Sequence, residues 1–119
     1  MTNGQIGGLV GFSLLLSAGQ TLFKVAALAT AEHAKSGLGL LSLLWLPSFW
    51  AAMVLYGSAT LLWIYLLQSV PLSRAYPFAA LGFVIVPALA ATFFGERVTM
   101  TYVIGAALIV TGILVTTQA

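Results

Sequence analysis

Four polar residues in the first hydrophobic segment of the chain are spaced as one face of a helix. They are Ser13, Ser17, Gln20 and Lys24, which lie four, three and four positions apart. At about 100° per residue, this spacing places all four within a sector of roughly 60°. The stripe ends in a lysine, and a cation suits an anionic group such as a phosphodiester. We therefore predict that this face binds an anionic substrate.

The helix that carries this polar stripe is long and apolar enough to cross a lipid bilayer. Lipid offers no hydrogen bonds, so polar side chains at that depth normally face protein or a wet cavity. Two simpler interpretations stay open. Lys24 is close enough to the helix end to extend towards the headgroups, and the three uncharged residues could instead bond neighbouring helices.

The whole chain has the composition of an integral membrane protein. Of its 119 residues, 61% are hydrophobic and only 5% are charged, which is far more apolar than a soluble domain. The formal charge of +2 comes mostly from loop residues, so nothing indicates nucleic-acid binding. The chain has no cysteine and one histidine, His33, so we expect no metal site. No acid–base or nucleophile–base pair has a plausible spacing, and we expect neither an enzyme nor a cofactor.

Apolar runs separated by short polar turns predict an all-α membrane protein, with a single four-helix transmembrane domain over residues 1–119. The predicted helices cover residues 6–30, 48–69, 74–94 and 100–117. Residues 31–39 are polar and glycine-containing, which predicts a surface loop. Residues 38–46 are apolar but too short to span, and they end at Pro47, so we expect an interfacial or re-entrant segment there.

Prolines and turn residues predict local features of the last two helices. Pro77 falls in the first turn of the third helix, where a missing N–H does no harm, whereas Pro87 is interior and should kink or loosen it. Thr99 is the predicted N-cap of the last helix. Glu96, in the same turn, is predicted to be a structural or capping residue favoured near that helix N-terminus.

Glycines mark two helix faces for close packing. In the first helix two pairs have a four-residue spacing that lets backbones approach, and these are Gly4 with Gly8 and Gly7 with Gly11. In the last helix Gly105 and Gly112 lie seven positions apart, on one face. Four helices are too few to enclose a sizeable pathway, so we predict a dimer with Gly105 and Gly112 at its interface. The loop charges are too evenly divided to fix its topology.

Several motifs resemble the drug/metabolite transporter superfamily. They are residues 17–24 (Ser-Ala-Gly-Gln-Thr-Leu-Phe-Lys), 67–77 (Leu-Gln-Ser-Val-Pro-Leu-Ser-Arg-Ala-Tyr-Pro), 95–99 (Gly-Glu-Arg-Val-Thr) and 104–115 (Ile-Gly-Ala-Ala-Leu-Ile-Val-Thr-Gly-Ile-Leu-Val). Within the superfamily the chain is most similar to the four-helix, EamA-like subunits of the aminoarabinose-phosphoundecaprenol flippase. The resemblance covers nearly the whole chain and is best over residues 66–115.

This resemblance implies a multi-pass protein of the bacterial inner membrane that is surrounded by membrane lipids. It would move a polyprenyl-phosphate-linked sugar across that membrane. It also implies a homodimer, or a heterodimer with a similar four-helix subunit. Arg74, Tyr76 and Trp63 join the polar stripe as candidate substrate-binding residues. Arg74 precedes a helix whose dipole favours phosphate, although it also suits an interfacial anchor. Tyr76 and Trp63 could stack on a sugar or pack against the protein.

Small multidrug resistance proteins are the chief alternative, because their glycine-bearing last helix is equally similar. They exchange protons for cationic drugs through a glutamate in the first helix, and a cation in a low-dielectric site does require such an anionic partner. Here the first helix carries Gln20 and Lys24, and both carboxylates, Glu32 and Glu96, are predicted in loops. We therefore expect an anionic substrate and no carboxylate in the site. A non-transporting subunit that supports a partner is the second alternative.

Overall fold

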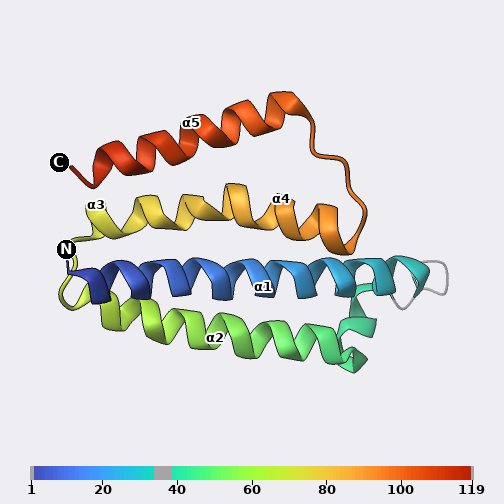
Figure 1. Cartoon of the computed structure of the whole chain (residues 1–119). Helices are drawn as coiled ribbons and strands as arrows, with labels where there is room; N and C mark the ends of the chain where they lie inside the picture. The colour runs from blue at the N-terminus through green and yellow to red at the C-terminus, as the bar shows by residue number, and fades with distance from the viewer. Residues whose placement is uncertain (1, 34–38, 119) are drawn as a thin grey trace.

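The computed structural model describes residues 2–33 and 39–118, which form a bundle of helices (Figure 1). The elements are α1 (Asn3–His33), the 3-10 helix η2 (Gly39–Trp45), α2 (Pro47–Leu67), α3 (Leu72–Ala75), the 3-10 helix η3 (Tyr76–Leu81), α4 (Gly82–Phe93) and α5 (Met100–Thr116). Because α3, η3 and α4 follow one another directly, the chain passes along the bundle four times, which confirms the predicted all-α membrane fold. The first three passes are long and apolar enough to cross a membrane, and α5 is a shorter apolar helix.

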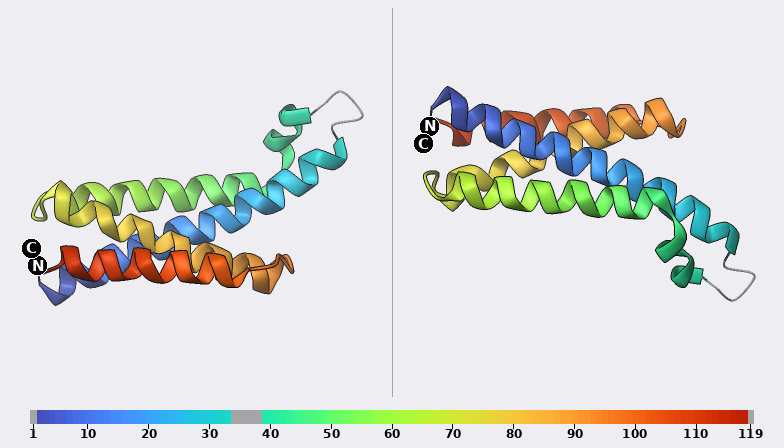
Figure 2. Two further views of the ribbon diagram at one scale, coloured as in Figure 1. Left: turned by 90° about the horizontal axis from the view of Figure 1, so that it is seen from above. Right: turned by 90° about the horizontal axis from the view of Figure 1, so that it is seen from below.

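The first helix, α1, lies at the centre of the bundle (Figure 2). It packs against α2 on one side and against η3 and α4 on another, while α5 packs on η3 and α4. Both termini lie at the same end of the bundle, together with the turn between α2 and α3 (Figure 1). Gln5 ties this end together, because its Nε2 donates a hydrogen bond to Ser69 Oγ at 3.0 Å. The loop between α4 and α5 lies at the opposite end.

Close packing of α1 on α2 depends on two glycines. A Cβ at Gly8 would lie 2.8 Å from the nearest leucine carbon of α2, and one at Gly19 would overlap the ring of Tyr56. Since lipid gives helices no hydrophobic drive to associate, this close van der Waals contact is what stabilises the pair. Added side chains at Gly7 and Gly11 would meet nothing within 4 Å. The prediction that this pair lets helices approach is therefore wrong for the packing within this chain.

The third pass is not the single α-helix predicted over residues 74–94. A 3-10 segment, Tyr76–Leu81, interrupts it between α3 and α4. Where η3 meets α4, the N–H of Gly82 donates to the carbonyls of Ala79 and Ala80 rather than to Phe78, four residues back. In such tighter winding each carbonyl pairs with an N–H three residues ahead, and its second lone pair can still accept from a side chain.

The connection between the first two passes extends beyond the bundle. The predicted surface loop of residues 31–39 is helical as far as His33, and residues 34–38 lie outside the described part of the chain. The apolar stretch before Pro47 forms the short 3-10 helix η2, not a further pass (Figure 2), as predicted from its length. Its position at the membrane interface stays a prediction.

Candidate functional site

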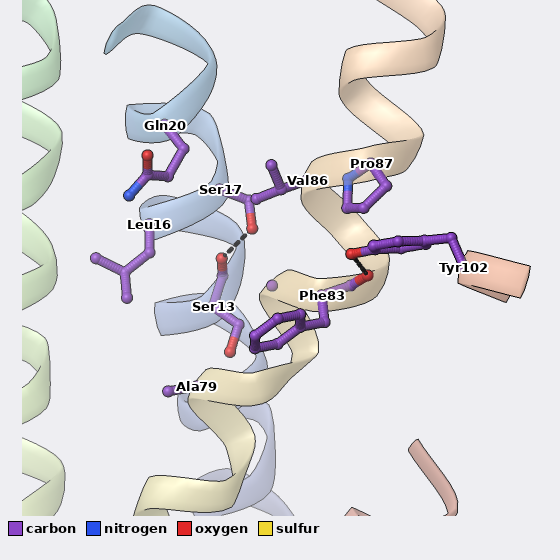
Figure 3. A pocket seen from close by; sticks show the side chains of 10 residues that line it. Ser13, Leu16, Ser17, Gln20, Ala79, Phe83, Val86, Pro87 and Tyr102 are labelled. Carbon is purple, nitrogen blue, oxygen red and sulfur yellow. Dashed lines mark hydrogen bonds between the residues drawn. The ribbon is translucent and has the colours of Figure 1, made fainter. Parts of the chain in front are cut away.

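The two serines of the polar stripe are buried where α1 meets the third pass. Ser13 Oγ donates a hydrogen bond of 2.6 Å to the carbonyl oxygen of Phe78 in η3. Ser17 Oγ donates to the carbonyl of Ser13 at 2.8 Å (Figure 3). Each serine is only 1% exposed. Ser13 therefore holds two passes together, as the interhelical interpretation of the stripe requires, while both serines also line a cavity.

Gln20 lies one turn further along the stripe and contacts the second pass. Its Nε2 donates to the hydroxyl of Tyr56 on α2. The tyrosine ring also lies against Phe23, with ring centroids 5.0 Å apart. Gln20 thus has an anchored amide, while its side chain borders the space between α1 and α4.

Lys24, at the end of the stripe, forms an ion pair with Glu96. Its Nζ lies 3.5 Å from Oε1 of Glu96, and the two side chains are 45% and 47% exposed. Gly95 makes this possible, because its φ of 64° turns the chain sharply after α4 in a conformation that glycine adopts freely. The N–H of Glu96 then donates back to the carbonyl of Ala90 at 3.3 Å, which folds the loop towards α1.

The expectation that the site contains no carboxylate is therefore wrong. Glu96 was predicted to cap or support the turn, but its carboxylate faces Lys24 across the helices. Thr99 performs the capping, as predicted, because its side chain accepts a hydrogen bond of 3.1 Å from the N–H of Tyr102. The charges of the site are thus a cation and an anion side by side.

A groove between α1 and α4 joins the stripe to this ion pair, and we call it the α1–α4 groove. Two cavities lie between these helices, and a third, lined by α4, the α4–α5 loop and α5, adjoins them and is counted with the groove. The deep cavity, of about 340 Å³, is lined by Ser13, Leu16, Ser17, Gln20, Ala79, Gly82, Phe83, Val86, Pro87 and Tyr102 (Figure 3). The charged cavity, also about 340 Å³, is lined by Gln20, Thr21, Phe23, Lys24, Ala27, Val86, Ala90, Phe94 and Glu96. The outer cavity, about 260 Å³, is lined by Val86, Pro87, Ala90, Glu96, Arg97, Val98, Thr99 and Tyr102.

Val86 borders all three cavities, so it lies at the middle of the groove. Most of the remaining lining of the deep cavity is apolar, while the polar groups come from α1 and from Tyr102. The groove therefore offers a mixed surface, with a track of hydrogen-bonding groups along one wall and charges at one end. Such a surface suits a polar head group attached to an apolar tail.

Pro87 shapes the opposite wall of the groove. It lies inside α4 and has no N–H to donate to the carbonyl of Phe83, four residues back. Tyr102 on α5 supplies the missing donor, because its hydroxyl lies 2.8 Å from that carbonyl oxygen (Figure 3). The predicted interior proline thus creates an attachment point for α5, since backbone groups at membrane depth need a partner.

We expect Tyr102→Phe to destabilise the bundle by about 0.6–1.7 kcal/mol, the range of interhelical hydrogen bonds in membranes. In a Pro87→Ala background the cost should be smaller, because the N–H of residue 87 can then donate to Phe83. Thermal unfolding of wild type, the two single variants and the double variant in one detergent gives the coupling energy between positions 87 and 102. An equal cost of Tyr102→Phe in both backgrounds would show that the hydroxyl does not replace the proline's missing bond.

The three other predicted substrate-binding residues lie away from the Lys24–Glu96 pair. Arg74 and Tyr76 are exposed on α3 and η3, at the end of the bundle opposite the α4–α5 loop (Figure 1). Trp63 belongs to α2 and stacks on Phe12, with ring centroids 4.6 Å apart. The structure thus brings together the polar stripe and Glu96, and it does not bring these three residues into the lining of the α1–α4 groove.

Three side chains at the site that the sequence analysis did not single out come from other parts of the chain. Tyr102 on α5 holds Phe83, and Arg97 in the α4–α5 loop lines the outer cavity beside Glu96. Tyr56 on α2 holds Gln20 without lining the groove itself. Only the role of Tyr102 has a signal in the sequence, because an interior proline leaves the carbonyl four residues before it without its usual N–H donor. The other two depend on which helices pack together.

Curated relatives match most of the chain. It is 41% identical over 102 residues, covering 86% of both chains, to a protein of Yersinia pseudotuberculosis named "Probable 4-amino-4-deoxy-L-arabinose-phosphoundecaprenol flippase subunit ArnE". A Yersinia pestis protein of the same name matches with the same identity and coverage. The similarly named protein of Hamiltonella defensa is 35% identical over 104 residues, 87% of each chain. No family model matches the chain, and no solved structure matches it.

Proposed function

Because the chain belongs to the ArnE family of flippase subunits, we propose that it carries the head group of an amino-sugar phosphopolyprenol across the bacterial inner membrane. The relatives' printed name supplies this substrate class, with a phosphate and an amino sugar on an undecaprenyl tail. Transport rather than enzymatic chemistry is the role that those names give to the relatives. In this chain, the residues of the α1–α4 groove would perform that transport.

One observation carries the proposal. Lys24 has a half-exposed side chain that lines the charged cavity, on the same helix face as Gln20 and the two serines that line the deep cavity. A phosphodiester is recognised by charge-assisted hydrogen bonds from such a group. We propose that Lys24 binds the phosphate, that Gln20 bonds the sugar, and that the hydroxyl oxygens of Ser13 and Ser17 accept from it further along the groove.

The lipid tail needs no enclosure in this mechanism. We propose that an undecaprenyl chain stays between the helices and the surrounding lipid while the head moves past α1. The apolar part of the groove lining is compatible with the first carbons of that tail. A protein of four passes can therefore guide a molecule much larger than any of its own cavities.

The name "subunit" supports assembly with a second chain, and we propose that this partner packs on the face of α5 that carries Gly105 and Gly112. A Cβ added at either glycine would meet nothing within 4 Å, so this face has room for a close neighbour. Gly112→Leu should then lower cross-linking between subunits in detergent, whereas Ala107→Leu, at an exposed position on the opposite side of α5, should not. Unchanged cross-linking of both would place the interface elsewhere.

Binding by purified protein in nanodiscs tests the proposed substrate class. We expect saturable binding of phosphoundecaprenol, no binding of undecaprenol without phosphate, and no binding of the hydrophobic cation tetraphenylphosphonium. Glu96 is the described carboxylate that a cation exporter would use, but Lys24 already neutralises it and repels a second cation. Binding of the cation with release of protons, and no preference for the phosphate, would restore the drug-exporter alternative.

A further inference from the structure

We propose that Glu96 recognises the amino group of the transported head, so that the Lys24–Glu96 pair is a receptor for a zwitterion. This inference rests on the proposed function, which supplies a head bearing a phosphodiester and an amine. In the receptor, Lys24 leaves Glu96 and binds the phosphate, while Glu96 binds the protonated amine. One internal ion pair is replaced by two ion pairs with the substrate.

The geometry of the pair suits this exchange. Its atoms are 3.5 Å apart, and both side chains are about half exposed. Exposed ion pairs contribute little to stability, and opening this one leaves neither charge buried without a partner. Both residues also line the charged cavity, so the head can reach them from the same space.

The two charges belong to separate elements, which allows them to move apart. Lys24 is on the long helix α1, and Glu96 follows Gly95 in the loop between α4 and α5. In an amino sugar with its phosphate on the anomeric carbon, the two charged groups lie on different sides of the ring. A site for that head requires a cation and an anion that can separate, and flexible side chains on two elements provide it.

A carboxylate beside Lys24 is a disadvantage for a site that binds phosphate alone. It competes for the ammonium and repels the incoming phosphate. Arg97, which lines the outer cavity with Glu96, adds a second cation near the same carboxylate. The carboxylate therefore contributes most when the ligand brings a positive charge, and it disfavours heads whose amine is absent or acylated. When Lys24 binds the phosphate of a head without a charged amine, Glu96 is left without a cationic partner from the ligand. This cost discriminates against such heads.

Two lipids that differ only in the amine test this role. Wild-type protein in nanodiscs is titrated at neutral pH with aminoarabinose-phosphoundecaprenol and with the same lipid N-acetylated on its amine. We expect wild type to bind the free amine about fivefold to tenfold more tightly, as one charge-assisted contact at an exposed site allows. Glu96→Gln should bind both lipids equally and should bind the acetylated lipid at least as tightly as wild type does. Glu96→Asp, which retains the carboxylate, should retain part of the preference.

The outcomes separate this inference from the proposed function. If Glu96→Gln keeps the full preference for the free amine, Glu96 does not recognise it, and the inference is overturned while phosphate binding stands. If wild type binds neither lipid, the proposed function fails and this inference fails with it. Thermal unfolding of each variant, compared with wild type, shows that a changed preference does not reflect a loss of folded protein.

Discussion

Replacing Lys24 by methionine is expected to weaken binding of the lipid phosphate roughly 10- to 150-fold. A charge-assisted hydrogen bond contributes about 1.5–3 kcal/mol, and about 1.4 kcal/mol corresponds to a tenfold change in affinity. Methionine retains the apolar stem of the side chain and removes the charge. Lys24→Arg should retain part of the affinity, because the charge survives while the shape of the donor changes.

The ion pair requires one further control for this prediction. Lys24→Met also leaves the carboxylate of Glu96 without its cation, which by itself would repel a phosphate. Glu96→Gln removes the carboxylate, and the double variant Lys24→Met/Glu96→Gln removes both charges, so the difference in affinity between these two proteins reports the loss of the ammonium alone. Titration of phosphoundecaprenol into nanodiscs measures wild type, both single variants and the double variant. An equal dissociation constant for Glu96→Gln and the double variant would mean that Lys24 does not contact the phosphate.

The polar stripe could be predicted because helical periodicity is a property of one segment. Ser13, Ser17, Gln20 and Lys24 do share a face, and all four line the α1–α4 groove. The number of passes was predictable for the same reason, since the length and hydropathy of each apolar segment indicate a helix without reference to the rest of the chain. The N-cap at Thr99 needs only the residues next to it. These features depend on local chemistry.

Partners across helices could not be predicted in the same way. Tyr56 lies 36 positions from Gln20, and no local pattern indicates that the two side chains meet. The pairing of Lys24 with Glu96 depends on the sharp turn at Gly95 and on the packing of α4 beside α1. A glutamate in a Gly-Glu-Arg turn looks like a capping residue until the fold places a lysine opposite it.

The third pass shows where backbone chemistry overrides an apolar pattern. Its hydropathy predicts one helix, but the third pass winds more tightly in η3, and the proline of α4 leaves a carbonyl without its usual N–H donor. Tyr102 replaces that donor, and Ser13 donates to a carbonyl of η3. Pro87 indicated in the sequence that the third helix would be disturbed, whereas nothing in the sequence indicated the 3-10 winding before Gly82.

Filling the groove at Val86 should slow movement of the head without removing the charged cavity. Val86 borders all three cavities, so a tryptophan there occupies the space through which the head passes. A barrier to passage that is higher by about 1–3 kcal/mol corresponds to a roughly 5- to 150-fold slower transfer. Val84→Trp is the matched control, because Val84 is on the same helix, is 40% exposed, and belongs to none of the groove linings.

The most direct test of the groove as the transport route is transfer of the lipid head between leaflets. This chain is purified together with its partner subunit and placed in proteoliposomes that contain aminoarabinose-phosphoundecaprenol. A membrane-impermeant reagent that reacts with amines then reports how fast lipid from the inner leaflet reaches the outer leaflet. The account predicts slow transfer for Val86→Trp, wild-type transfer for Val84→Trp, and phosphate binding in both. Wild-type transfer by Val86→Trp would contradict it, because the head would then cross the membrane by a route outside the α1–α4 groove.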